Sequence, residues 1–295
     1  MIAIDTVGVL GCGQMGSGIA QAAAVAGYAV IARDLSEEQC ARGRKTIEQS
    51  TARLVEKGKL EAKMRDAALA RIRFTTSFED LASSDLVIEA VTEDLDLKNR
   101  QWTALDGICP PATLFASNTS SLSIMAMAAV TARPDRFLGL HFFNPVPMMP
   151  LVEVVRSVAT SNETIEAGTA FVRRLGKEPI AARDSAGFIV NLLLIPYLLD
   201  AVRAVERGVA SIRDIDTGMT LGCGHPMGPL TLLDFVGLDT ACKVGEILYE
   251  EFREARYAPP ALLKRMVLAG WYGKKTGRGF YDWSVNPAVP AELGF

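Results

Sequence analysis

Residues Thr6–Gly16 read T-V-G-V-L-G-C-G-Q-M-G and decide the fold. Their apolar first half contains β-branched valines and predicts a strand, and the alanine-rich residues 14–26 predict a helix. The pattern G-x-G-x-x-G lies at the junction, with glycines at Gly11, Gly13 and Gly16. Asp34 directly follows the next strand-like run, residues 28–33, and lies 18 residues beyond Gly16. In this strand–loop–helix context the pattern predicts a dinucleotide-binding site.

Each glycine of the pattern has its own expected role. Gly11 permits the tight turn, Gly13 lets the backbone approach a pyrophosphate, and Gly16 lets the helix and the strand pack closely. The pyrophosphate then lies at the positive N-terminus of the helix. The cofactor contacts predicted in this segment are Gly11, Gly13, Gln14, Met15 and Gly16.

The acidic residue after the second strand predicts which dinucleotide binds. The Asp34 carboxylate is expected to accept hydrogen bonds from the adenosine ribose hydroxyls and to repel a 2′-phosphate, which favours NAD over NADP. Arg33, the neighbouring residue, weakens that preference slightly because it is a cation.

The rest of the chain separates into two parts. Further strand-like runs at 86–91, 113–116, 137–143, 151–155 and 179–182 alternate with helical segments, which predicts a mostly parallel sheet covered on both faces. Beyond Asp184 we expect only helices, at 188–207, 212–221, 230–253 and 260–268. The predicted fold is an α/β Rossmann-type doubly wound sheet followed by an all-α C-terminal domain. The predicted domains are residues 1–184 for NAD binding and residues 185–295 for substrate binding and dimerisation.

Composition excludes several other classes of protein. The chain has 295 residues, a hydrophobic fraction of 49% and a formal net charge of −3. These values argue against disorder, and against nucleic acid or an anionic membrane as the main partner. The most apolar stretch, residues 188–199, is shorter than the roughly 20 residues that a membrane span needs. The five cysteines form no C-x-x-C pair and the N-terminus does not resemble a signal peptide, so we expect reduced thiols, no metal site and a cytoplasmic protein.

A possible catalytic pair follows from strand register. The chain has two histidines, His141 and His225. Two apolar runs flank a turn with three prolines, and if they form an antiparallel pair centred on Pro147, opposed positions sum to 294. His141 and Glu153 sum to 294 and should therefore face each other across the ladder. An imidazole held by a carboxylate can serve as a general base; the alternative for a single histidine is a core residue with its hydrogen bonds satisfied.

Seven motifs in order give the chain a family resemblance. They are G-C-G-Q-M-G-S-G from residue 11, E-A-V-T-E from 89, S-N-T-S-S from 117, H-F-F-N-P from 141, L-V-E-V from 151, G-F-I-V-N from 187 and G-H-P-M-G-P from 224. Together they resemble the 3-hydroxyacyl-CoA dehydrogenase family, and most of all its stand-alone 3-hydroxybutyryl-CoA dehydrogenases. The resemblance implies an NAD-dependent oxidation of an (S)-3-hydroxyacyl-CoA to the 3-ketoacyl-CoA by a homodimer, in fatty acid β-oxidation or butanoate metabolism.

The resemblance also implies site residues. It makes His141 the base and Glu153 its electrostatic partner, and it gives Ser120 and Asn191 hydrogen bonds to the substrate oxygen. The implied cofactor contacts outside the glycine pattern are Glu93, Lys98, Ser120, Asn144 and Lys275. The implied CoA contacts are Ser50, Lys57 and Ser120.

Other roles remain open for several of these residues. A core amide is the alternative for Asn191, a turn residue for Asn144, and solvated loop charges for Glu93 and Lys98. His225 lies in a Pro/Gly-rich corner between helices, where it is expected to fix the connection through a backbone hydrogen bond.

A local excess of basic residues favours a CoA ligand independently of the family. Residues 42–73 hold ten basic and four acidic side chains, a local charge of +6. CoA carries several phosphate charges that such a segment can receive; the alternative is a solvated basic face.

Two other functions are compatible with this sequence. One is the same fold acting on 3-hydroxyadipyl-CoA or on a free hydroxy acid, and the other is a non-catalytic NAD-binding protein. Cys223 and Pro150 depart from the residues that many relatives carry, which puts the acyl-chain preference in doubt.

Overall fold

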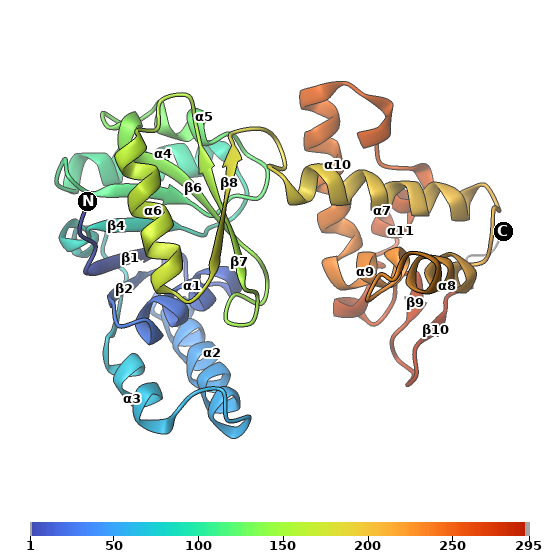
Figure 1. The fold of residues 1–295 in the computed structure, drawn as a ribbon, viewed down its shortest axis with the longest axis horizontal. Helices are drawn as coiled ribbons and strands as arrows, with labels where there is room; N and C mark the ends of the chain where they lie inside the picture. Colours follow the sequence, from blue (N-terminus) through green and yellow to red (C-terminus); the bar gives the residue numbers. More distant parts are fainter. Residues whose placement is uncertain (1, 293–295) are drawn as a thin grey trace. The chain divides into compact units, whose positions relative to one another are not determined.

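The computed structural model describes residues 2–292 and divides into two compact units after Phe188 (Figure 1). The first unit contains the glycine pattern and all strands of the main sheet. The second is mainly helical. The domain boundary between residues 184 and 185, and the functions assigned to the two domains, stay predictions.

The first unit is built on an eight-stranded sheet. Its strands lie in the order β3-β2-β1-β4-β5-β6-β7-β8, and every neighbouring pair is parallel except β6 and β7. The strands are β1 (Thr6–Leu10), β2 (Ala29–Arg33), β3 (Ile72–Thr75), β4 (Leu86–Glu89), β5 (Leu114–Ser117), β6 (Phe137–Phe142), β7 (Leu151–Arg156) and β8 (Glu178–Arg183). β3, a partly exposed edge strand, was not predicted because its four residues lack an apolar run and the first two belong to the basic segment.

Helices cover both faces of this sheet. They are α1 (Gln14–Val25), α2 (Glu37–Glu56), α3 (Ala62–Ala70), α4 (Leu95–Ile108), α5 (Ile124–Ala128) and α6 (Asn162–Arg174). One buried cluster joins the sheet to α1, α2, α3 and α6, and a second joins its other face to α4 and α5. Two separate clusters on one sheet define a doubly wound arrangement, so the predicted fold class is confirmed.

The second unit packs five helices: α7 (Val190–Glu206), α8 (Ile212–Cys223), α9 (Pro229–Val236), α10 (Leu238–Phe252) and α11 (Ala261–Leu268). The single helix predicted over residues 230–253 is wrong, because the backbone of Gly237 adopts φ +100° and separates α9 from α10. The expectation of helices alone also missed a hairpin of β9 (Tyr281–Asp282) and β10 (Val289–Pro290), each too short for a sequence pattern. Among the described residues, no helix has the length and apolar composition needed to cross a bilayer.

Candidate active site

The glycine pattern forms a tight turn between β1 and α1. Gly11 has φ +104°, a conformation that favours glycine, and its N–H donates to the Arg33 carbonyl at 2.8 Å. A Cβ on Gly16 would lie 1.8 Å from the carbonyl oxygen of Gly11. Only hydrogen fits at Gly16, so the start of α1 can lie directly against the end of β1.

The space beside Gly13 suits a dinucleotide. A Cβ built on Gly13 meets no protein atom within 4 Å, so protein packing does not require glycine there. Gly13 is also the N-cap of α1, and within residues 2–292 no side chain caps this helix or places an acidic group in its first turn. A helix N-terminus left open in this way is suited to a pyrophosphate.

Alanine substitution should have different effects at these two glycines. Gly16→Ala should lower the stability of the cofactor-free protein by about 1–3 kcal/mol, because its Cβ overlaps backbone. Gly13→Ala should change that stability by less than about 0.5 kcal/mol, since its methyl group enters empty space. We expect Gly13→Ala instead to weaken NADH binding. Urea unfolding and NADH titration of both variants check this, and equal stability losses would contradict it.

Asp34 lies directly beside this turn. Its Oδ2 accepts the Cys12 N–H at 2.6 Å and its Oδ1 accepts the Leu35 N–H at 2.6 Å. Arg33, in contrast, is 7% exposed, donates from Nε to the Thr76 carbonyl at 3.1 Å and lies 3.9 Å over the ring of Phe78. The Arg33 guanidinium, the cation next to Asp34, is therefore held by Thr76 and Phe78.

The strand register predicted for His141 is the register of the structure. His141 pairs with Glu153 across β6 and β7, and Nδ1 lies 2.5 Å from Glu153 Oε2. His141 is 4% exposed and Glu153 is fully buried. The imidazole also lies near two rings, Phe143 at 4.6 Å and Phe188 at 5.6 Å between centroids. A buried imidazole paired through Nδ1 is fixed in orientation and has Nε2 left for proton exchange.

Ser120 lies in the turn that follows β5. Asn118 Oδ1, in the same segment, accepts the Phe142 N–H at 2.9 Å, which fastens this turn to the strand that carries His141. The Ser120 N–H donates to Glu93 Oε1 at 3.1 Å. The predicted catalytic residues of the first unit therefore belong to adjoining segments at one end of the sheet.

Glu93 and Lys98 belong to one charge network, in which Lys98 is buried and Glu93 is partly exposed, so Lys98 is not a solvated loop charge. Lys98 is 1% exposed, and its Nζ lies 2.6 Å from Glu89 Oε1 and 3.2 Å from Glu93 Oε2. Burial would raise the pKa of Glu93, but the Lys98 charge and hydrogen bonds from Thr119 and Ser120 outweigh it and lower that pKa below its usual range.

Asn144 is placed against the glycine turn. Gln14 Nε2 donates to Asn144 Oδ1 at 3.0 Å, so two predicted cofactor contacts hold each other. Met15 belongs to the same helical turn as Gln14 and is partly buried.

Three residues singled out in the sequence lie in the second unit. Asn191 is in the first turn of α7. Lys275 Nζ is bound to Asp239 at 2.7 Å. His225 Nδ1 pairs with the Tyr197 hydroxyl at 3.1 Å, and its backbone N–H donates to the Met219 carbonyl at 3.3 Å, in agreement with a structural corner.

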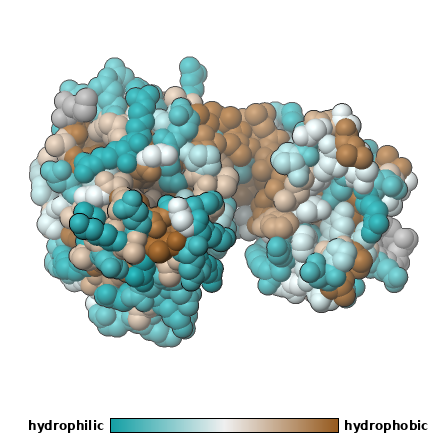
Figure 2. Space-filling view, turned by 60° about the horizontal axis from the view of Figure 1, so that its bottom comes forward, coloured by the Kyte–Doolittle hydropathy of each residue, from teal (hydrophilic) through white to brown (hydrophobic). Residues whose placement is uncertain are grey.

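The basic segment covers most of α2, all of α3 and the first two residues of β3. Figure 2, which brings α2 and α3 forward, shows this side of the first unit largely hydrophilic. Ser50 is half-buried on α2, and Lys57 is exposed as the residue that caps this helix. Part of the positive charge is neutralised within the protein, because Arg42, Arg65 and Arg73 form salt bridges with acidic side chains.

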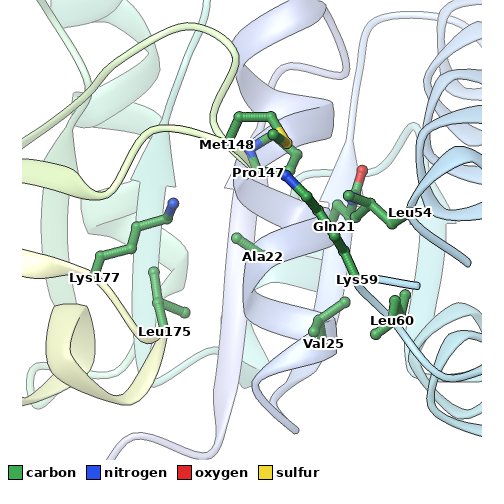
Figure 3. A pocket seen from close by; sticks show the side chains of 10 residues that line it. All are labelled: Gln21, Ala22, Val25, Leu54, Lys59, Leu60, Pro147, Met148, Leu175 and Lys177. Atoms are coloured by element: carbon green, nitrogen blue, oxygen red, sulfur yellow. The ribbon is translucent and has the colours of Figure 1, made fainter. Parts of the chain in front are cut away.

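A pocket of about 310 Å³ adjoins this end of α2 (Figure 3). Leu54, Lys59 and Leu60 line one side, and Pro147 and Met148, from the turn after β6, line another. In Figure 3 the amino group of Lys59 points towards Pro147.

A second lysine of this pocket holds the turn after β6. Lys177 Nζ donates to the carbonyls of Val146 and Met149, both at 2.6 Å, and burial lowers its pKa.

Sequence reasoning missed three polar groups of the first unit, of which Glu89 and Asn118 are buried and Asp184 is partly buried. Glu89 ends β4 and binds Lys98, and Asn118 ties β5 to β6. Asp184 accepts the N–H groups of Ile124 and Met125 and so caps α5. The signal available for Glu89 was a charge at the end of an otherwise apolar strand.

Comparison with known proteins places this arrangement in one class. The sequence-family model for the NAD binding domain of 3-hydroxyacyl-CoA dehydrogenase matches residues 6–185. The family model for the C-terminal domain of the same enzyme matches residues 187–283. The chain is 48% identical to 3-hydroxybutyryl-CoA dehydrogenase of Mycobacterium tuberculosis over 283 residues, which cover 95% of this chain and 99% of the relative. It is 44% identical to human mitochondrial hydroxyacyl-coenzyme A dehydrogenase over 289 residues, 96% of this chain and 92% of the relative.

A solved structure agrees with these matches. The crystal structure of (S)-3-hydroxybutyryl-CoA dehydrogenase from Ralstonia eutropha superposes with a TM-score of 0.92 at 49% identity, and the match covers 96% of this chain and all of that one (100%). The protein is thus an oxidoreductase that uses NAD. The chain belongs to the 3-hydroxyacyl-CoA dehydrogenase family.

Proposed function

We propose that the protein interconverts (S)-3-hydroxybutyryl-CoA and acetoacetyl-CoA with NAD, with His141 and Glu153 as the general acid/base pair. The observation that carries the proposal is the buried contact of 2.5 Å between His141 Nδ1 and Glu153 Oε2 in a dinucleotide-binding unit. The name of the relative at 48% identity, 3-hydroxybutyryl-CoA dehydrogenase, supports the choice of substrate.

The pair moves one proton. In the oxidation, His141 Nε2 accepts the proton of the C3 hydroxyl, and Glu153 stabilises the positive imidazolium that results. NAD held at the turn of Gly11, Gly13 and Gly16 would supply the acceptor for the hydride of C3. In the reduction the imidazolium returns the proton to the forming alkoxide, so the same two residues serve both directions.

Two neutral groups complete the proposed substrate site. Ser120 and Asn191 are assigned hydrogen bonds to the reacting oxygen, which acquires charge as its proton moves. Ser120 is held by Glu93 in the first unit. Asn191 lies in the first turn of α7 and keeps the role that the family resemblance implies.

We assign the CoA part of the substrate to the end of α2. Ser50, Lys57 and Lys59 lie there, and the neighbouring pocket adds apolar side chains beside the cations. A phosphate-bearing arm with an apolar portion matches this combination of charge and surface.

Initial rates test the substrate class. With NADH, we expect turnover of acetoacetyl-CoA and a decline across 3-ketoacyl-CoA chains from four to about sixteen carbons, with free acetoacetate inactive. Lys57→Ala should raise KM for acetoacetyl-CoA about three- to tenfold, as loss of one phosphate contact at an exposed site implies. Free acid turned over as well as the thioester would contradict the assignment, as would an unchanged KM in Lys57→Ala. Glu61→Ala, at an exposed position nearby, is a control for surface change.

Cofactor choice gives a separate prediction. Asp34→Ser should lower kcat/KM for NADH about ten- to hundredfold, since a charged hydrogen bond of about 1.5–3 kcal/mol is lost. NADPH should remain a poor substrate even then, because Arg33 is held by Thr76 and Phe78. Rates with both cofactors check this, and efficient NADPH use by the variant would contradict it.

We also propose a homodimer in a reducing, cytoplasmic compartment. Large apolar side chains of the second unit are exposed, including Leu193 at 65%, Leu221 at 83% and Leu268 at 87%, and association would cover such groups. All five cysteines are unpaired, which suits reducing conditions.

A further inference from the structure

We propose that Glu89 is a positioning residue for the reaction. Its carboxylate, at the end of β4, holds the turn of residues 119–121 in place through Lys98 and Glu93. The inference rests on the proposed role of Ser120, which this turn carries.

The Glu89 carboxylate is fully buried and fully engaged. Oε1 accepts Lys98 Nζ at 2.6 Å and the Val91 N–H at 2.7 Å, and Oε2 accepts the Ser117 hydroxyl at 2.6 Å. A buried carboxylate is tolerated only with such partners. Three donors from three segments therefore fix where this group lies.

Lys98 transmits that position to a second carboxylate. Its side chain is 1% exposed, and Nζ also lies 3.2 Å from Glu93 Oε2. Because both partners are acidic and the ammonium is enclosed, Lys98 acts here as a bridge between Glu89 and Glu93.

Glu93 then organises the turn with a single oxygen. Oε1 accepts the Thr119 hydroxyl at 2.5 Å, the Ser120 N–H at 3.1 Å and the Ser121 hydroxyl at 3.3 Å.

A second route from Glu89 reaches the same turn. Ser117, whose hydroxyl donates to Glu89, accepts the Thr119 N–H at 3.2 Å. Glu89 is therefore linked to the turn that carries Ser120 by two paths, and only the first of them includes Lys98.

Neutralising Glu89 changes the balance of this network. The network holds two carboxylates and one ammonium, so Glu89→Gln leaves one of each, and Lys98 is expected to shift towards Glu93. Displacement of a reacting group by a fraction of an ångström lowers turnover, and we expect kcat to fall about 30-fold while KM for NADH changes less than about threefold. Ser117→Ala, which breaks only the second route, should lower kcat by a smaller factor.

The test is a double-mutant cycle in kcat. Glu89→Gln and Ser120→Ala are measured alone and together, because a residue that acts through Ser120 loses its effect when the hydroxyl is absent. The same cycle is run with Ser117→Ala, so that the test does not depend on the folding of Glu89→Gln alone. Asp106→Asn is the matched control: Asp106 and Arg133 form a mostly buried ion pair of 2.6 Å in the same unit, apart from the turn.

The expected result is a double variant no slower than Ser120→Ala by more than about twofold, with kcat of Asp106→Asn near wild type despite a lower Tm. Multiplicative losses in the cycle would overturn the inference and leave the proposed function intact. An equal loss of kcat in Asp106→Asn would overturn it by showing a general structural effect. A silent Ser120→Ala would instead contradict the role of Ser120 in the proposed function.

Discussion

Replacing His141 by alanine should lower kcat for acetoacetyl-CoA reduction about 10³-fold, the middle of the range for a general acid/base. Its imidazole lies 2.5 Å from Glu153, at the end of the sheet that holds the glycine turn. Because the hydrogen bond and ring contacts of this side chain in the described chain are with Glu153, Phe143 and Phe188 and not with that turn, NADH binding should stay within about threefold of wild type. Steady-state kinetics and NADH titration separate the two effects.

The second histidine of the chain provides the control for this variant. His225 is bound to Tyr197 in the second unit. His225→Gln should therefore keep kcat within about threefold of wild type, since surface and corner substitutions cost little chemistry. A His141→Ala protein that binds NADH and keeps more than about a tenth of wild-type kcat would contradict the assignment of the base.

Glu153→Gln should have the second largest effect. The substitution keeps the shape of the side chain but removes the charge that stabilises the imidazolium. Breaking a buried ion pair costs about 3–5 kcal/mol, and if most of that cost falls on the protonated form, kcat drops about 10²–10³-fold. We expect the double variant with His141→Ala to be hardly slower than His141→Ala alone.

An exposed glutamate on the neighbouring strand is the control for charge. Glu178 begins β8, whose residues pair with those of β7. Glu178→Gln removes the same charge at the surface and should leave kcat unchanged within about twofold. Glu153→Gln activity close to that of Glu178→Gln would show that the buried carboxylate does not act on the base.

The parts of the site that sequence could predict are those with local geometric rules. The turn around Gly11 and the place of Asp34 follow from chain spacing and backbone sterics alone. The register of His141 with Glu153 followed from a single turn centre because the period of a strand is two residues. Both features are set by neighbours in the chain.

Features that depend on tertiary packing were out of reach. Glu89 appears in the sequence as the polar end of an apolar strand, and its partners Lys98 and Ser117 come from α4 and β5. The break at Gly237 was missed because apolar spacing continues across it, and β3 forms because β2 offers it an edge. In each case the deciding contact comes from another segment of the chain.

The most direct test of the account is a single turnover of the wild-type protein with NADH and acetoacetyl-CoA. With enzyme in excess, NADH absorbance reports hydride transfer, and the product is separated by chirality. We expect one NADH to be oxidised per acetoacetyl-CoA, with (S)-3-hydroxybutyryl-CoA as product. Bound NADH that is not oxidised by acetoacetyl-CoA, or formation of the opposite enantiomer, would contradict it.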